Sequence, residues 1–516
     1  MKSTLLSGLF LLLWPLYLGA QPISTSGGIL HLVDAVQTSI ARHPTLEIQR
    51  QEIEITDALR RQASSIFDPV LQAGVDRGRL YSPLASATGF SLSPSDTSQI
   101  GASYSKLLRS GLQMTGSVGL SRQIETAAIR GGLTTTSTQL QFVFPLMRGR
   151  GTEVTTSGER AAALQRDGSV LDLRHLTASL MTRVVSSYWG LAAAQRSRAV
   201  AAASVERGDR LVDNTRALIA ADQSPRADLA SALANAADRQ AARFVSDQAY
   251  VEARQQLILD MGLRLGEFPD AAALDDFSML GQLPAVRDLP EDVQPFIEGA
   301  LQRRADYLAA QTRVEAARLS RDAARNGLLP AVDLSMTVGH SALAEGREFS
   351  KYFSAVFHDV QGPTVVGQIS YRFPTENSLA AGRFAQAEAQ FQQATLAAAD
   401  VARTIRASVV TAHSDLRNAR LRLEKARESV QAFQDALKGE QDKLALGIGS
   451  IINLLTIEDR LTSASEREVA AWRSYGQALV GFRFATGTLI PVRDPLPTLD
   501  VSTFTTIPLP SAGGRP

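Results

Sequence analysis

The sequence predicts a mostly helical protein that also carries membrane-type β-strands and is built as two copies of one plan. Three observations support this fold class. An apolar heptad repeat is sustained over about five heptads in the second half, which indicates a very long coiled-coil helix. Stretches in which apolar and small polar residues alternate precede each long helical stretch, which indicates strands. The order of helix and strand patterns in the first half recurs in the second half.

The longest helix is expected from about Thr375 to Leu446. Its seam combines two apolar series at a spacing of seven: Val409, Leu416, Leu423, Val430, Leu437 and Leu444, interleaved with Ile405, Ala412, Ala419, Ala426 and Phe433. Charged residues such as Arg406, Arg417 and Arg420 lie off the seam, as expected of a solvated face. About seventy helical residues would extend roughly 105 Å at the rise of an α-helix. Ordinary globular domains do not contain helices of this length, so we expect an elongated structure.

Composition and the N-terminus indicate an exported protein. The 516 residues include 53 basic and 52 acidic side chains, and this balance argues against nucleic acid as the main partner. Residues 1–20 combine Lys2 with an apolar run from Leu5 to Leu18, which is the pattern of a secretory signal peptide. An N-terminal anchor helix is the alternative. The sequence contains no cysteine, so the exported chain would have no disulfide, thiolate metal site or thiol nucleophile.

The first repeat is expected to span residues 30–263. A helical pattern from Leu30 to Phe67 ends before Pro69, because the residue preceding a proline disfavours the helical conformation. Pro225 marks a turn after the first long helix. We therefore divide this repeat into a half helix, β-strands (69–145), a long helix (150–219) and a second half helix (226–263), followed by an equatorial connector (264–292).

The strands in the first repeat have two chemically different faces. Leu71, Ala73 and Val75 alternate with polar or small residues, and similar alternation recurs at 100–105, 114–121 and 139–144. Runs of about nine to twelve residues suit tilted transmembrane strands with one lipid face and one aqueous face. A soluble antiparallel sheet is the alternative, since alternation alone does not distinguish the two.

The second repeat is expected to span residues 293–487. Pro69 aligns with Pro330 at an offset of 261, whereas Leu180 aligns with Ile405 at an offset of 225. The first repeat is therefore longer by 36 residues, which is about one hairpin with its loop. We divide the second repeat into a half helix, β-strands (331–373), a long helix (375–446) and a half helix (451–487). A Pro-rich tail (488–516) follows, which we expect to be extended or disordered, with no packed core of its own.

So few strands cannot close a sheet in lipid by themselves. The two edge strands would expose unpaired backbone groups to the hydrocarbon, where no water can satisfy them. The chain is therefore expected to pool its strands with copies of itself in a closed ring. In such a ring the long helices would form a coiled-coil barrel about 100 Å long.

Three segments, together with this duplicated order, resemble the TolC-like outer-membrane efflux protein (outer membrane factor) family. They are His43-Pro44-Thr45-Leu46, the stretch from Pro145 to Gly151, and the stretch from Lys443 to Ser450. The resemblance covers about residues 30–487 and implies a homotrimer with a transmembrane β-barrel and a periplasmic α-barrel. The family barrel has twelve strands, or four per chain. The extra hairpin would raise this to eighteen if Ser98 to Gln123 joins the sheet.

The resemblance also suggests functional residues at the helix turns. Leu446, Gly447, Ile448, Gly449 and Ser450 match the family turn that docks the periplasmic adaptor, although a simple helix terminator explains the two glycines equally well. The periplasmic entrance of the family is often narrowed by acidic residues just after this turn. Here those positions hold Asn453 and Thr456, and Asp228 occupies the position in the first repeat equivalent to Asn453. Three Asp228 carboxylates would favour cations at the entrance. The alternative for Asp228 is a solvated carboxylate that stabilises a helix N-terminus.

The sequence gives no pattern for catalysis, a cofactor or a metal. None of the six histidines has an i, i+4 partner or lies in a ligand cluster. Gly149-Arg150-Gly151 and Gly447-Ile448-Gly449 lack the context of a phosphate-binding loop. Tyr188 and Trp189 on the first long helix are expected to pack in a core. We therefore expect no enzyme activity.

Taken together, the residues and the resemblance predict an outer-membrane channel that extends into the periplasm. It would be the passive export duct of a tripartite efflux or type I secretion system. Its expected partners are two further copies of itself, a periplasmic adaptor protein, an inner-membrane transporter and outer-membrane lipid. The alternative is a structural coiled-coil protein of the cell envelope that forms no channel.

Overall fold

The computed structural model describes most of the chain. The described residues are 29–86, 89–125, 132–222, 225–264, 266–268, 273–275, 277–280, 289–345, 360–446, 448–490 and 500–508. The predicted signal peptide (1–20) lies outside them, as do Gly447 of the predicted docking turn and parts of the Pro-rich tail.

The chain divides into two compact units, and both repeats contribute to each. The helical unit comprises residues 1–47, 176–303 and 407–516. The sheet unit comprises residues 48–175 and 304–406. The units therefore cut across the two predicted repeats, because each repeat supplies one set of strands and one set of helices.

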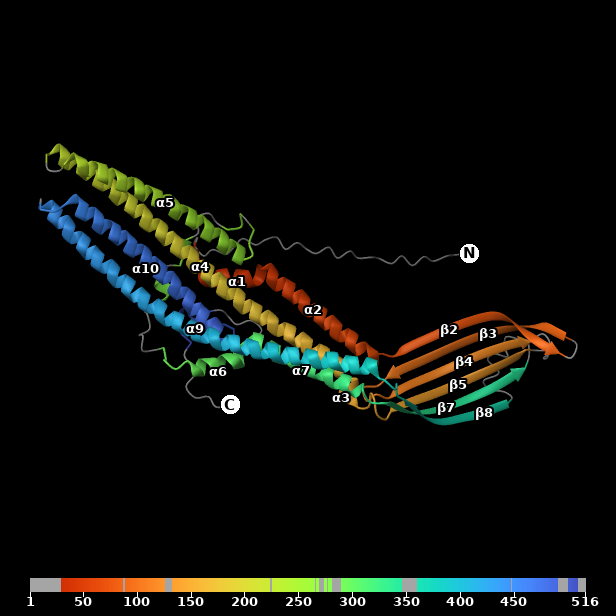
Figure 1. The fold of residues 1–516 in the computed structure, drawn as a ribbon. Helices are drawn as coiled ribbons and strands as arrows, with labels where there is room; N and C mark the ends of the chain where they lie inside the picture. Colours follow the sequence, from red (N-terminus) through yellow and green to blue (C-terminus); the bar gives the residue numbers. More distant parts are fainter. Residues whose placement is uncertain are drawn as a thin grey trace, which may run out of the picture. The chain divides into compact units, whose positions relative to one another are not determined.

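The sheet unit contains one antiparallel sheet of six strands in the order β2-β3-β4-β5-β7-β8 (Figure 1). The strands are β2 (Val70–Ser86), β3 (Gly89–Leu107), β4 (Gln113–Glu125), β5 (Leu133–Pro145), β7 (Ala331–Glu345) and β8 (Val360–Arg372). The two repeats join where β5 pairs with β7, with Leu140 opposite Val338. Both strands of the extra hairpin, within Ser98 to Gln123, lie inside this sheet, so each chain contributes six strands.

The tight turn between β3 and β4 depends on a glycine. Gly111 has a φ of +92°, a conformation that other residues rarely adopt. A Cβ atom at this position would also lie 2.6 Å from the backbone oxygen of Gly149. The turn closes with hydrogen bonds from the Leu108 N–H to the Leu112 oxygen (2.8 Å) and from the Gly111 N–H to the Leu108 oxygen (2.9 Å).

Helices complete the sheet unit. They are most of α2 (Pro44–Ser64), η1 (Ser65–Phe67), α3 (Thr152–Thr155), the first part of α4 (Ser157–Ala220), α7 (Ala305–Asn326) and the first part of α9 (Ser378–Ala445). Ala161 of α4 packs against Ala316 and Leu319 of α7. The small side chains at this contact allow the two helix backbones to approach closely.

The helical unit contains the remainder of α4 and α9 and the shorter elements. These are β1 (Ile29–Leu30), α1 (Leu32–Arg42), α5 (Arg226–Asp260), β6 (Ala273–Leu274), η2 (Phe277–Leu280), α6 (Gln294–Arg303), α10 (Ile451–Ala485) and α11 (Ser502–Thr505). Its core includes Leu211 of α4, Val430 and Leu437 of α9, and Leu454 and Leu461 of α10. The apolar stripes of three helices thus meet in one cluster.

The predicted long coiled-coil helix is confirmed as α9, which has 68 residues. Ile405, Val409, Leu416 and Leu423 of the seam are at most 1% exposed. The expectation of a solvated position for Arg420 is wrong, because this side chain is buried. Arg420 directly follows a seam position, and α9 buries a face wider than a strict heptad stripe.

The predicted duplication is confirmed by the helix boundaries. α5 (226–260) and α10 (451–485) match at the 225-residue offset at both ends. α4 and α9 end at Ala220 and Ala445, which differ by the same offset.

The half helix expected from Leu30 to Phe67 is interrupted. α1 ends at Arg42, the backbone of its C-cap His43 is extended (φ −69°, ψ 123°), and α2 begins at Pro44. Proline forces this break, because its ring disfavours a helical conformation in the preceding residue. The second repeat breaks at Arg304, 261 residues later, between α6 and α7. There the guanidinium of Arg304 donates to Asp306 in the first turn of α7.

Tyr188 and Trp189 pack in the core, as predicted, and neither is exposed. The Tyr188 hydroxyl donates to the Leu30 oxygen (2.8 Å) and accepts from the Asp275 N–H (2.8 Å). The Trp189 ring stacks on Phe277, with ring centroids 5.5 Å apart. These contacts fix the short parallel pairing of β1 with β6, which lies within the connector (264–292).

Part of the Pro-rich tail is folded, which differs from the extended chain expected there. Within residues 500–508, Phe504 is fully buried. Arg483 of α10 donates to the Thr506 oxygen at 2.8 Å. One aromatic residue and one arginine therefore hold this part of the tail on α10, despite the prolines around it.

Candidate channel wall and helix turns

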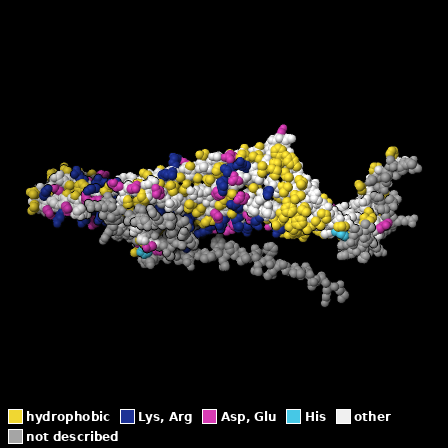
Figure 2. Space-filling view, turned by 90° about the horizontal axis from the view of Figure 1, so that it is seen from below, with side chains coloured by type: hydrophobic (Ala, Val, Ile, Leu, Met, Phe, Trp, Pro, Cys, Tyr) yellow, Lys and Arg dark blue, Asp and Glu magenta, His cyan; other side chains and the backbone are white. Residues whose placement is uncertain are grey.

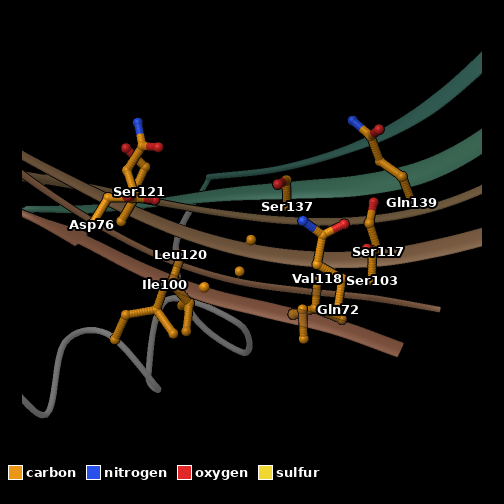
Figure 3. A pocket seen from close by; sticks show the side chains of 15 residues that line it. Gln72, Asp76, Ile100, Ser103, Ser117, Val118, Leu120, Ser121, Ser137 and Gln139 are labelled. Carbon is orange, nitrogen blue, oxygen red and sulfur yellow. The ribbon is translucent and has the colours of Figure 1, made fainter. Parts of the chain in front are cut away.

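One face of the six-stranded sheet is polar. Paired residues of neighbouring strands point to the same face, and every second residue along a strand does so too. The register therefore places these polar side chains on one face: Gln72, Asp76, Gln99, Ser103, Ser117, Ser121, Ser137 and Gln139. These residues line an open hollow of about 510 Å³. Figure 3 shows Asp76, Ser121 and Ser137 on one side of the strands, whereas Ile100 and Leu120 project to the other side. Amide, hydroxyl and carboxylate groups at this density suit the wall of a water-filled passage.

The opposite face is apolar and exposed. It carries Leu71, Val75, Ile100, Val118, Leu140, Val338, Val365 and Ile369, which are 38–76% exposed. Figure 2 shows a continuous hydrophobic patch of this kind on one side of the molecule. Tyr104, Phe144 and Tyr371 lie on this face toward the strand ends that connect to helices. An apolar band bordered by aromatic rings is typical of a sheet that contacts lipid.

The turn between α9 and α10 exposes two large apolar side chains. Leu446 is 76% exposed and Ile448 is 75% exposed. The Ile448 N–H donates to the Lys443 oxygen (3.0 Å), which ends α9. A Cβ on Gly449 would lie 2.7 Å from the Leu444 nitrogen, so this position accepts only glycine. Ser450 is the N-cap of α10. The turn is thus a tight helix terminator that also exposes two large apolar side chains.

The three candidate entrance residues lie at the starts of α5 and α10. Asp228 is partly exposed in the first turn of α5, and its N–H donates to the Pro225 oxygen (3.1 Å). Asn453 and Thr456 are exposed in the first turns of α10. The Thr456 hydroxyl donates to the Ile452 oxygen (2.9 Å). All three are accessible to solvent in one chain, and their role at an entrance stays a prediction.

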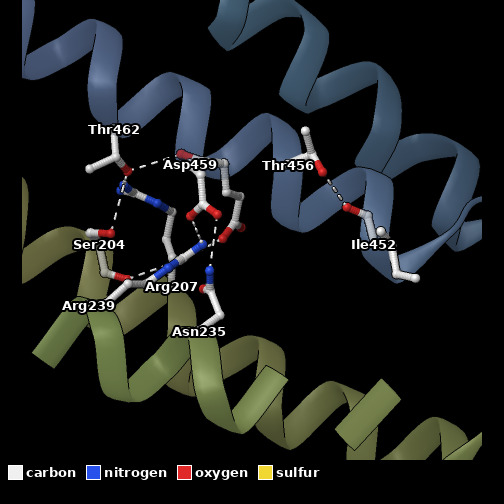
Figure 4. Close-up of polar contacts among 9 residues, drawn as sticks. Ser204, Arg207, Asn235, Arg239, Ile452, Thr456, Asp459 and Thr462 are labelled. Atoms are coloured by element: carbon white, nitrogen blue, oxygen red, sulfur yellow. Dashed lines mark hydrogen bonds and ion pairs between the residues drawn. The ribbon is translucent and has the colours of Figure 1, made fainter. Parts of the chain in front are cut away.

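A buried ionic cluster connects α4, α5 and α10 in the helical unit (Figure 4). Arg239 of α5 donates to Glu458 (2.8 Å) and Asp459 (3.0 Å) of α10 and to the Ser204 oxygen of α4 (3.2 Å). The side chains of Arg239 and Glu458 are 5% and 6% exposed. Glu458 is therefore a buried charge and not a solvated helix charge. Sequence patterns did not reveal this pair, because its members are 219 residues apart.

A second acidic group in the helical unit is partly buried. Glu466 of α10 accepts a hydrogen bond from the Ser197 hydroxyl of α4 at 2.6 Å. Burial raises the pKa of the Glu466 carboxyl, although the hydrogen bond from Ser197 acts in the opposite direction.

Neither a metal cluster nor a membrane helix is found in the part of the chain that the structure describes. No group of three or more His, Asp or Glu side chains there could hold a metal ion. None of the described helices has an apolar stretch long enough to cross a membrane.

Residues 296–488 match the family model described as outer membrane efflux protein. The match spans α6, α7, β7, β8, α9 and α10, which together form the second repeat. No curated protein sequence matches the chain.

Solved structures share the fold over nearly the whole chain. The outer-membrane channel OprN has a TM-score of 0.63 and 18% identity, and the alignment covers 89% of this chain and 90% of OprN. The CmeC outer membrane channel of Campylobacter jejuni has a TM-score of 0.64 and 13% identity, with 91% and 87% covered. The outer membrane protein VceC of Vibrio cholerae has a TM-score of 0.63 and 16% identity, with 88% and 96% covered. The predicted fold class is therefore confirmed.

Proposed function

Because residues 296–488 match the family model described as outer membrane efflux protein, we propose that the chain is the outer-membrane export duct of a tripartite efflux or type I secretion system. The family match supports the predicted outer-membrane location with a periplasmic extension, and members of this family are not enzymes. In the proposed system an inner-membrane transporter supplies the energy, and a periplasmic adaptor couples it to this passive duct.

The observation that carries the proposal is the six-stranded sheet with two opposite faces. β2 and β8 each pair with one neighbour only within the described sheet, so both edges offer unpaired backbone groups. Those groups must pair if the sheet is inserted in lipid. Strands of neighbouring copies satisfy both edges in a homotrimer, with the apolar face toward lipid and the polar face toward water.

Such a trimer would have eighteen strands, against the twelve of the family. With strands about 4.8 Å apart and tilted by about 40°, twelve strands close a barrel about 24 Å across between backbones. Eighteen strands close one about 36 Å across. We therefore propose a wider exit through the outer membrane than a twelve-stranded barrel provides.

The helix turns would form the periplasmic end of the duct. The exposed Leu446 and Ile448 are proposed to contact the adaptor, since exposed apolar side chains on a tight turn mark an interaction surface. Asp228, Asn453 and Thr456 are proposed to line the entrance. Asp228 supplies the only charge among these three residues, so a ring of three copies would favour cations.

The test is planar-bilayer conductance of the purified mature protein, with Asp228→Ala beside it. We expect discrete channels that prefer cations in the wild type and a weaker preference in the variant. Glu252→Ala, which removes an exposed carboxylate elsewhere on α5, is the matched control and should keep the wild-type preference. If Asp228→Ala leaves the channels unchanged, the proposed duct stands, and Asp228 is a solvated carboxylate that stabilises the start of α5. A protein that stays in solution without detergent and never conducts would support the structural coiled-coil alternative.

A further inference from the structure

The apolar face of the sheet carries an unusual excess of positive charge. The described strands contain five basic residues, and the register places four of them on the apolar face: Arg77, Arg79, Lys106 and Arg122. Of the five acidic residues on the same strands, the register places only Asp96 on this face. The register places the other four on the polar face: Asp76, Glu125, Asp333 and Glu345. Charge is costly on a lipid-facing surface unless an anionic partner is available there.

The three arginines form a patch on β2 and β4. Arg79 is paired with Asp96 through two hydrogen bonds, at 2.5 and 2.8 Å, so the acid of this face is neutralised. In the adjacent row, Arg77 stands opposite Ser98 of β3, and Ser98 stands opposite Arg122 of β4. Two strand spacings separate the two arginines by about 10 Å. Ser98, which has a small side chain, lies between them in this row.

The position of this row along the strands is also informative. Apolar residues of this face lie on both sides of the row: Val75, Ile100 and Leu120 are on the helix side, and Tyr81, Leu92 and Phe90 lie beyond it. Along β4, Arg122 is eight residues beyond Met114, which corresponds to about 27 Å of strand and about 21 Å of height at a 40° tilt. The lipid-facing apolar band of outer-membrane barrels is about 25 Å tall. The row therefore lies near the border of that band, on the side away from the helices.

We propose that Arg77 and Arg122 form a binding site for a phosphate group of a phosphorylated glycolipid in the outer leaflet of the membrane. This inference depends on the proposed function, because it needs the apolar face in lipid and the helices in the periplasm. The guanidinium group matches phosphate in shape and charge and binds it through paired hydrogen bonds. The acyl chains of the same molecule would lie along Val75, Ile100 and Leu120, which form the next row on this face.

The experiment measures lipid that copurifies with the full chain. Wild-type protein is inserted into phosphatidylcholine vesicles that contain diphosphoryl lipid A, extracted in mild detergent and analysed by mass spectrometry. The variants are R77Q/R122Q and, as the control, R372Q, which removes an exposed arginine on the polar face. Each arginine near an anionic lipid surface strengthens binding by a factor of about five. The double variant should therefore retain at most about one tenth of the lipid A that the wild type retains.

Further arms distinguish the source of the phosphate. The first arm uses lipid A without its phosphates. Wild-type protein should retain this lipid only weakly, to the same extent that the double variant retains diphosphoryl lipid A. Inorganic phosphate in excess should displace none of the bound glycolipid; complete displacement would mean that the site takes free phosphate, and would overturn the proposal. Equal retention by wild type and R77Q/R122Q, with both conducting normally in bilayers, would overturn this inference and leave the proposed function intact. A wild-type protein that enters no bilayer would overturn both.

Discussion

The buried ion pair between Arg239 and Glu458 gives the sharpest stability prediction. Arg239→Ala would leave Glu458 as a carboxylate with 6% side-chain exposure and without its charged partner. Removing one member of a buried pair costs about 3–5 kcal/mol, because the remaining charge has lost water and gained no counter-ion. The side chain of Asp459 is 51% exposed, so its loss adds at most about 1 kcal/mol.

The assay is thermal unfolding of the helices, followed by far-ultraviolet circular dichroism of detergent-solubilised protein. One kcal/mol corresponds to about 2–4 °C in Tm for a unit of this size, so Arg239→Ala should lower the Tm by roughly 6–20 °C. Arg216→Ala is the matched control, since Arg216 pairs with Asp213 on the surface of α4 and both side chains are more than half exposed. The control should change the Tm by no more than about 3 °C.

A second variant separates the charge effect from lost packing. Arg239→Met combined with Glu458→Leu replaces the pair with apolar side chains of similar size and should recover most of the lost stability. The reasoning would be refuted if Arg239→Ala lowered the Tm no more than Arg216→Ala does. It would also be refuted if the double variant were less stable than Arg239→Ala, because an uncompensated charge would then not be the cause.

Three further perturbations follow from the structure. Gly476→Val should lower the Tm and weaken the near-ultraviolet dichroism of Trp189, because a Cβ on Gly476 would lie 2.9 Å from that ring; an unchanged spectrum would contradict the packing. Since burial raises the pKa of Glu466, its protonated form is favoured in the fold, so this group stabilises the fold at low pH and the stability is lost as the pH rises above about 4.5. Glu466→Gln, which can still accept from Ser197, should therefore raise the Tm at pH 7–8 but not at pH 4, and an equal gain at both would contradict this sign. Ile448→Ser should reduce export in cells without changing channel conductance in bilayers, and normal export would remove the turn from the proposed adaptor contact.

Patterns of short range made much of this fold predictable. The heptad series through Val409 and Leu416 specifies one buried stripe on one helix, and a helix forms from contacts within four residues. The alternation around Leu71 specifies two strand faces for a similar reason. The offsets of 261 and 225 follow from internal repetition in the chain, and their difference assigns the extra hairpin to the first repeat.

The break at His43 could also have been found from the sequence. Pro44 follows it directly, and a proline disfavours a helical conformation in the residue before it. The apolar periodicity continues across both sides of the break, which explains why the pattern suggested one helix. The equivalent break at Arg304 has no proline and gave no such signal.

The sequence by itself determined the helix and strand pattern, the duplication and the two faces of each strand, because each depends on residues close together along the chain or on internal repetition. Only the tertiary structure decided that the extra hairpin joins the same sheet, that Arg239 meets Glu458, and that Arg77 and Arg122 share one row. These facts depend on strand order, register and helix packing, which bring together residues from 45 to more than 200 positions apart. No local periodicity encodes such pairings. A charged residue that is solvated and a charged residue that forms a buried ion pair can both lie off the apolar seam of a helix, so the pattern does not distinguish them.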